Sequence, residues 1–212
     1  MSAKSDRLPI TQNKASANYV VVDPPPETIN GDSIFGRKPH LVSFCIPTLN
    51  SERTIGDCLG SIASQNYPET EIVIVDGGSS DHTLEIASKY TDNMQFDDGT
   101  LGSARQTSVD HSMGEVIALF DSDVVIPHRD WLENAIQYFN YSERVSTVWP
   151  VVVAPPNAPW TARLYANIWK ITMEDRIRKH RGVFGGGNAL FVRSCIDKIG
   201  GINRSLHWGG RF

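Results

Sequence analysis

The sequence lacks several features that would point to particular classes of protein. Its three cysteines, Cys45, Cys58 and Cys195, lie far apart within apolar runs. This predicts buried thiols in a reducing compartment, because a zinc site needs a tighter cluster. Nowhere does the chain reach about eighteen uninterrupted apolar residues, and MSAKSDRLPITQNK at its start lacks the apolar core of a signal peptide. We therefore expect a cytoplasmic segment, while peripheral association with the inner face of a membrane stays open.

The chain also lacks an excess of basic residues. It carries 20 Lys and Arg against 24 Asp and Glu, a formal net charge of −4. Such a surface offers no broad positive field for phosphate backbones, so nucleic acid is not an expected partner. With 40% hydrophobic and 21% charged residues, the composition is that of a folded globular protein, and 212 residues suffice for one α/β domain but not comfortably for two.

Apolar patterning divides the chain into three parts. Residues 1–40 form a polar, Pro-rich extension with one apolar run at 19–22. Residues 41–153 alternate short apolar runs with segments of helical spacing, which predicts a mostly parallel sheet with helices on both faces, a Rossmann-like α/β fold. From 154 onward the sequence has several prolines, an aromatic amphipathic helix and a glycine run. The expected strands are 41–46, 71–75, 93–96, 116–120, 147–153 and 189–192, and the expected helices are 54–66, 84–90, 102–113, 131–139 and 160–178. In the first two helices the core-facing stripes are expected at Ile55, Leu59 and Ile62, and at Leu84, Ala87 and Tyr90.

Three of the predicted strands end in polar residues. These ends are residues 47–50, 76–81 and 121–123. In open α/β sheets, ligands bind beyond the carboxyl ends of the strands. Loops of this composition offer backbone groups and short polar side chains, which suit recognition of a nucleoside.

The third strand end, Asp121-Ser122-Asp123, predicts a metal site. Two carboxylates directly after an apolar run are costly to bury without a partner, and a divalent cation is a natural one. In an extended segment the two point the same way, so one can bind Mg²⁺ or Mn²⁺ directly and the other through water or a ribose. The alternative is that both aspartates only form turns or helix caps, as a lone D-x-D often does.

Four segments in this order resemble a known family. Together they are similar to the signatures of family 2 glycosyltransferases with the GT-A fold, over about residues 41–209. The segments are VSFCIPTLN at 42–50, IVDGGSSD at 74–81, GSAR at 102–105 and ALFDSD at 118–123.

The resemblance implies roles on the donor side. Pro47, Thr48 and Asn50 would line the base and ribose of a UDP- or GDP-linked sugar, and Asp76 would bind the nucleoside unless it only caps its turn. Arg105 would lie near the diphosphate or order the Asp121 loop, with a solvent salt bridge as the alternative.

The same resemblance implies the metal and acceptor residues. Asp121 and Ser122 would contact the donor, and Asp123 together with Asp121 would hold the metal. The glycine run Gly186, Gly187 and then Asn188 would lie under the sugar and acceptor, unless it merely connects flexibly to the next strand. Residues 41–153 would then be the donor half, and 154–212 an incomplete acceptor half.

The resemblance breaks at the end of the chain. Family members carry a Glu-Asp pair whose Asp is the catalytic base for inverting transfer, but Gly210 and Arg211 occupy those positions, and neither accepts a proton. A frameshift, a truncation or a degenerate binding protein would each explain this. His207 is a substitute base or a loop histidine, and Asp175 is expected to be a surface charge.

These observations leave three hypotheses. The first is a metal-dependent glycosyltransferase that moves a sugar from a nucleotide diphosphate to a glycan, lipid or polysaccharide acceptor. The second is an inactive nucleotide-sugar-binding module without its base. The third, a nucleotidyltransferase, would carry a Gly-rich basic loop after its first strand, and residues 47–52 do not supply one.

Overall fold

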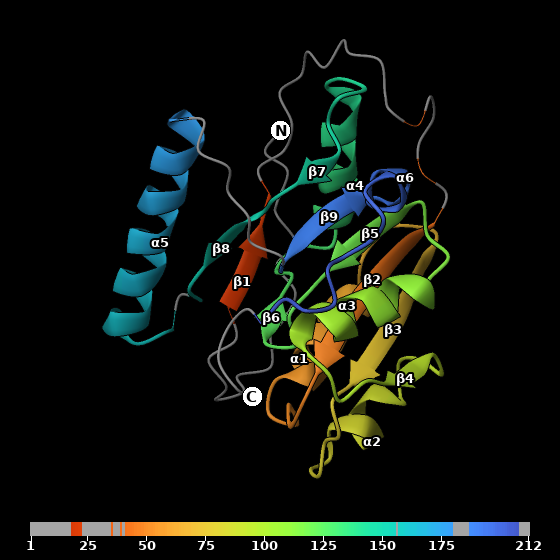
Figure 1. The fold of residues 1–212 in the computed structure, drawn as a ribbon. Helices are drawn as coiled ribbons and strands as arrows, with labels where there is room; N and C mark the ends of the chain where they lie inside the picture. The colour runs from red at the N-terminus through yellow and green to blue at the C-terminus, as the bar shows by residue number, and fades with distance from the viewer. Residues whose placement is uncertain are drawn as a thin grey trace.

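A six-stranded sheet forms the centre of the described chain (Figure 1). The computed structural model describes residues 18–22, 35, 39, 41–155, 157–179 and 187–207. The first four strands of the sheet are parallel, and β9 runs antiparallel to both of its neighbours. The predicted mostly parallel sheet is confirmed. In sheet order the strands are β4 Met94–Phe96, β3 Thr70–Asp76, β2 Val42–Thr48, β5 Val116–Leu119, β9 Ala189–Val192 and β7 Thr147–Val148.

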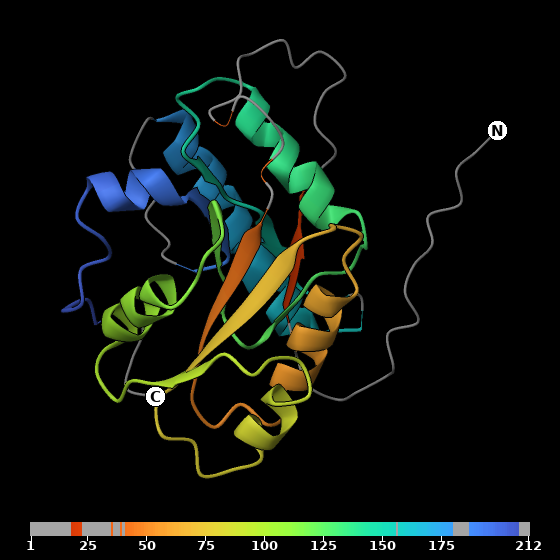
Figure 2. The same ribbon diagram turned by 90° about the vertical axis from the view of Figure 1, so that its right-hand side faces the viewer.

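Helices cover both faces of this sheet (Figure 2). Alternate residues of β2 explain the two layers: Phe44 and Ile46 belong to a large apolar cluster with α1 and α4, whereas Cys45 joins a smaller cluster with α3 and α6. The helices are α1 Ile55–Ala63, α2 Thr83–Ala87, α3 Leu101–Asp110, α4 Trp131–Gln137 with the short 3₁₀ helix η1 Tyr138–Asn140, α5 Trp160–Arg178 and α6 Arg193–Lys198.

Two predicted helix stripes had different outcomes. In α1 the spacing of Ile55, Leu59 and Ile62 places all three in the core, as expected. In α2 the stripe expected from Leu84, Ala87 and Tyr90 is only partly present, because Ala87 is buried but Leu84 and Tyr90 are exposed. A helix of one and a half turns cannot present a long stripe, and Tyr90 lies beyond its end.

A second, three-stranded sheet departs from the prediction. It joins β6 Val124–Val125, β1 Asn18–Val21 and β8 Val151–Val153. The extension before residue 41 therefore contributes a strand, although most of that extension lies outside the described residues. The single strand expected over 147–153 is wrong as well. It is interrupted at Trp149-Pro150 and serves two different sheets, which fits the inability of proline to donate to a strand ladder.

The thiols differ in accessibility, and the expectation that all three are buried is wrong for Cys195. Cys45 and Cys58 are buried, but Cys195 on α6 is half-buried. Burial raises the pKa of Cys45 to about 11 and that of Cys58 further still.

We expect one thiol of the folded chain to react with a maleimide at neutral pH, because the thiolate is the reactive form and two thiols are held protonated and inaccessible. Intact mass spectrometry should show one label on the native chain, three after denaturation, and none on native Cys195→Ser. Labelling of native Cys195→Ser would contradict the burial of the other two thiols.

Helix α5 stands apart from the sheet (Figure 1). It is confirmed where the sequence predicts it, over Trp160–Arg178, and its contacts are mainly with β8. Among the described residues, none of the helices combines the length and apolarity that crossing a bilayer would require.

Candidate functional site

The three polar strand ends meet at one edge of the sheet. Strand β2 lies between β3 and β5, and all three run in the same direction. The Gly77 N–H donates to the Thr48 carbonyl at 2.9 Å, and the hydroxyls of Ser51 and Ser122 lie 2.9 Å apart. The loop after β2 is thus bonded to both of the others.

The loop after β2 interlocks with the turn after β3. The Asn50 N–H donates to Ser79 Oγ at 2.9 Å, and the Ser80 N–H donates to Asn50 Oδ1 at 2.9 Å. Asn50 has a left-handed backbone with φ of 49°, a conformation that asparagine tolerates better than most residues. Its side chain therefore braces the neighbouring turn.

Asp76 makes the bonds of a turn cap. It is 4% exposed, and its Oδ2 accepts from the N–H groups of Gly78 at 2.9 Å and Ser79 at 2.8 Å. Its Oδ1 accepts from Ser79 Oγ at 2.5 Å. The capping role considered from the sequence is present, and any bond to a nucleoside would be additional, because each carboxylate oxygen can accept more than one hydrogen bond.

Pro47 and Thr48 are less accessible than a base-lining role suggests. Both are buried, whereas Asn50 at the tip of the loop is exposed. Within the described residues, Thr48 Oγ1 is buried without a hydrogen-bond partner. A buried hydroxyl without a partner is unusual and marks a place where a polar group could be received.

Asp121 is held by two partners from distant parts of the chain. Arg105 Nη2 on α3 donates to Asp121 Oδ1 at 3.2 Å, and Asn188 Nδ2 donates to Oδ2 at 2.9 Å. The Asp121 N–H in turn donates to Asn188 Oδ1 at 3.0 Å. Arg105 is only 9% exposed, so its ion pair with Asp121 does not join two solvent-exposed side chains.

Gly187 and Asn188 adjoin the same carboxylate, while Gly186 lies outside the described residues. Asn188 reaches Asp121 from a left-handed backbone with φ of 57°. A Cβ added to Gly187 would lie 2.7 Å from Asp121 Oδ2 and 2.9 Å from Arg105 Nη2. Only glycine leaves these two side chains room to pair.

Asp123 lies in the same loop as Asp121, two residues further along the chain. Its side chain is exposed, but the surrounding protein removes part of its hydration. This partial desolvation, together with the negative charge of Asp121, raises the pKa of the Asp123 carboxyl. A divalent ion would offset that repulsion, and carboxylate oxygens suit Mg²⁺ or Mn²⁺. The described residues contain no cluster of three or more acidic, His or Cys ligands. Two carboxylates can hold such an ion only if water and a bound diphosphate supply its remaining ligands.

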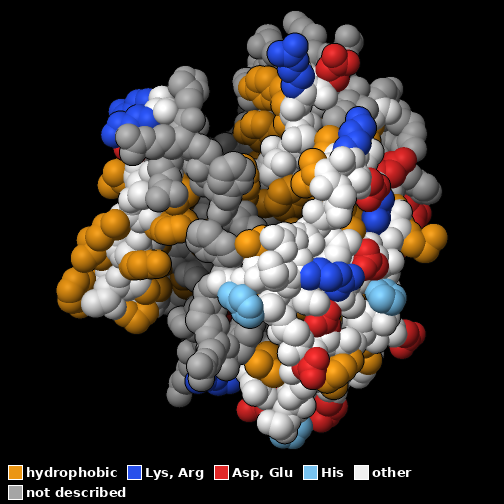
Figure 3. All heavy atoms as spheres, viewed as in Figure 1, with side chains coloured by type: hydrophobic (Ala, Val, Ile, Leu, Met, Phe, Trp, Pro, Cys, Tyr) orange, Lys and Arg blue, Asp and Glu red, His pale blue; other side chains and the backbone are white. Residues whose placement is uncertain are grey.

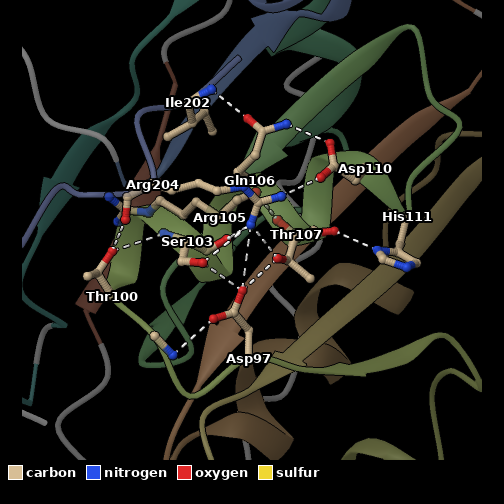
Figure 4. Close-up of polar contacts among 12 residues, drawn as sticks. Asp97, Thr100, Ser103, Arg105, Gln106, Thr107, Asp110, His111, Ile202 and Arg204 are labelled. Atoms are coloured by element: carbon tan, nitrogen blue, oxygen red, sulfur yellow. Dashed lines mark hydrogen bonds and ion pairs between the residues drawn. The ribbon is translucent and has the colours of Figure 1, made fainter. Parts of the chain in front are cut away.

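A polar network on the other side of α3 was not anticipated from the sequence (Figure 4). Arg204 Nη2 donates to Asp110 Oδ2 at 2.6 Å, and Arg204 Nη1 donates to Thr107 Oγ1 at 3.0 Å. The Gly102 N–H donates to the Leu206 carbonyl at 3.1 Å. The sequence signal that could have pointed to this region is the N-cap residue Thr100, whose hydroxyl accepts from the Ser103 N–H at 3.1 Å.

This network docks residues 201–207 on the helix that also carries Arg105. His207 at the end of that segment is exposed. Gly210 and Arg211 lie outside the described residues. Asp175 forms surface ion pairs with Arg178 and Lys179, as a surface charge would.

Comparisons with known proteins identify the fold. The mannosyltransferase PcManGT from Pyrobaculum calidifontis superposes with a TM-score of 0.60 at 21% identity, over 85% of this chain and 52% of that one. Glucosyl-3-phosphoglycerate synthase from Mycobacterium tuberculosis gives a TM-score of 0.55 at 16% identity, over 85% of this chain and 66% of that one. The Rossmann-like GT-A fold implied by the resemblance is confirmed.

Sequence comparisons identify the family. Glycosyltransferase AglE of Haloferax volcanii is 31% identical over 178 residues, which are 80% of this chain and 58% of that protein. The chain thus spans little more than half the length of this relative. The model of glycosyl transferase family 2 matches residues 43–200. With that match covering most of its length, the chain belongs to glycosyl transferase family 2.

Proposed function

We propose that this chain binds a nucleotide-diphosphate sugar with a divalent metal ion, and that the protein transfers the sugar to a glycan, lipid or polysaccharide acceptor. One observation carries the proposal. Asp121 is fixed at a strand end by Arg105 and Asn188, and Asp123 lies two residues further along the same loop. Such preorganised carboxylates favour a cation and the phosphates that accompany it.

Structural relatives support the kind of donor. PcManGT is described in complex with GDP-Man and Mn²⁺, and glucosyl-3-phosphoglycerate synthase in complex with UDP. We accordingly propose a uridine or guanosine diphosphate sugar as donor, and Mn²⁺ or Mg²⁺ as the ion.

We assign the residues as follows. Asp123 and Asp121 would hold the ion, which offsets the charge of the leaving nucleoside diphosphate. Arg105 orients Asp121, and Ser122 is fixed by Ser51. Asp76 and Asn50 shape the turn that would receive the nucleoside. Residues 41–153 would form the donor half and 154–212 part of the acceptor half.

Inverting transfer also needs a base for the acceptor hydroxyl. Gly210 and Arg211 cannot fill that role, so the alternative of an inactive binding module predicts donor binding without turnover. Family membership favours the enzyme. Release of free sugar or of nucleoside diphosphate from a UDP- or GDP-linked donor, assayed on this chain and on Gly210→Glu/Arg211→Asp, distinguishes the two.

Binding itself is tested by isothermal titration calorimetry with UDP and GDP. The expected result is micromolar to millimolar affinity with Mn²⁺ or Mg²⁺ and a loss of binding in EDTA that returns on adding excess metal. Equal affinity with and without metal, or no binding of either nucleotide, would refute the proposal.

Gly187→Ala is expected to weaken this binding by roughly tenfold or more, because the new methyl displaces the Asp121 and Arg105 side chains from their pairing positions. The atoms it meets are the ends of side chains, so thermal unfolding should change little. Gly56→Ala is the control, since its added Cβ meets only Ile86 Cγ2 at 3.4 Å. Unchanged nucleotide affinity in Gly187→Ala would show that the Asp121 geometry does not matter for binding.

A further inference from the structure

Helix α5 exposes an apolar stripe from Trp160 to Ile171 (Figure 3). Trp160, Leu164, Ile168 and Ile171 follow at intervals of four, four and three residues, which places them on one helix face. Their exposed fractions are 69%, 50%, 54% and 65%. Exposed apolar side chains that are contiguous rather than scattered mark a site of contact with another protein or with a membrane.

Aromatic and basic side chains flank this stripe. Tyr165 and Trp169 are also exposed and extend it on one side. Arg163 and Lys170, seven residues apart, share the other side, where Lys170 Nζ lies 3.8 Å from Glu174 Oε1. Trp and Tyr beside an apolar face, with Lys and Arg next to it, are typical of helices that lie at a membrane interface.

The charge of the helix differs from that of the chain. Residues 160–179 carry five Lys and Arg against two Asp and Glu, whereas the whole chain carries 20 against 24. An anionic surface complements this local excess. A second copy of the chain would instead bring two positively charged helices together, and like charges across an interface oppose association.

We propose that α5 is a membrane-docking helix that lies in the headgroup layer of an anionic bilayer, with the stripe defined above facing the acyl chains. The helix lies apart from the sheet (Figure 1), and the side chains of the stripe are exposed. The docking surface consists of residues of α5 alone. Its use, which is to bring the acceptor half to an acceptor in the membrane, rests on the proposed function.

The test is co-sedimentation of the full chain with phosphatidylcholine vesicles, with and without about one third phosphatidylglycerol. The stripe variant is Leu164→Ser/Ile168→Ser/Ile171→Ser. Its matched control changes three apolar residues that are at least as exposed elsewhere, Phe96→Ser/Met113→Ser/Ile199→Ser. The chain and the control should bind anionic vesicles, and the stripe variant at least about tenfold more weakly.

A second variant tests the charge. Arg163→Glu/Lys170→Glu keeps the stripe and should weaken binding to the anionic vesicles roughly tenfold or more, an effect that high salt mimics in the unchanged chain. Equal sedimentation of the chain, the stripe variant and the charge variant would overturn the proposal. The proposal would also be overturned if the unchanged chain bound no vesicles. One such result would be a chain that binds no vesicles and forms a dimer that the stripe substitutions dissociate.

Calorimetry with UDP or GDP and Mn²⁺ separates this inference from the proposed function. The stripe variant and the charge variant should bind nucleotide as the unchanged chain does, because α5 makes none of the described contacts of Asp121. Vesicle binding without nucleotide binding would refute the donor site alone, and nucleotide binding without vesicle binding would refute the docking helix alone.

Discussion

Asp123→Ala is expected to lower the metal-dependent affinity for UDP or GDP by roughly a hundredfold or more. Loss of residues that merely support metal ligands costs about 10- to 100-fold, so loss of a ligand itself should cost at least as much. Titration calorimetry in the presence of Mn²⁺ measures the effect, with Asp92→Ala as the control because that exposed carboxylate lies before β4, in a different loop. Wild-type affinity in Asp123→Ala would remove the metal site from the proposal.

A second substitution at position 123 is expected to affect nucleotide binding and folding stability in different ways. The pKa of Asp123 is raised, so its ionised form is disfavoured in the folded chain, and its charge at neutral pH destabilises the fold. Asp123→Asn removes that charge at nearly constant shape. Without metal it should unfold at the same or a higher temperature than the unchanged chain, while it loses nucleotide binding. A lower unfolding temperature would show that Asp123 serves the fold.

Gly114→Ala is expected to cost about 3 kcal/mol or more of folding free energy, which is large against the stability of a domain. A Cβ there would lie 2.4 Å from Ser43 Oγ, 2.7 Å from Ser43 N and 2.9 Å from the Leu41 carbonyl oxygen. Two of these atoms belong to the backbone at the start of β2 and cannot move aside. The clash would also break the bond in which the Gly114 N–H donates to Ser43 Oγ at 2.7 Å.

Urea denaturation monitored by circular dichroism measures this cost. Gly60→Ala is the matched control within α1, where the nearest atom to an added Cβ is Tyr90 Oη at 3.4 Å. Because alanine favours a helix interior over glycine, the control should be neutral or stabilising by up to about 1 kcal/mol. Equal stability of Gly114→Ala and the unchanged chain would mean that the turn before β5 relaxes freely.

The sequence alone determined the parts of this protein that depend on local pattern. Apolar runs and helical spacing predicted β2, β3, β5, α1 and α5 near their observed positions. The rule that ligands gather at the carboxyl ends of parallel strands then singled out the strand ends at Asp76 and Asp121. These inferences succeed because burying one face of a helix or strand requires apolar residues at a regular spacing within that element.

Only the tertiary structure decided how distant residues combine. Asn188 follows Asp121 by 67 positions and bonds it twice, and no local pattern encodes that pairing. The recruitment of β1 beside β6 and β8, and the division of residues 147–153 between two sheets, likewise depend on which strand edges remain open. Spacing along the chain constrains neighbours within one element, whereas these contacts arise from the packing of whole elements against one another.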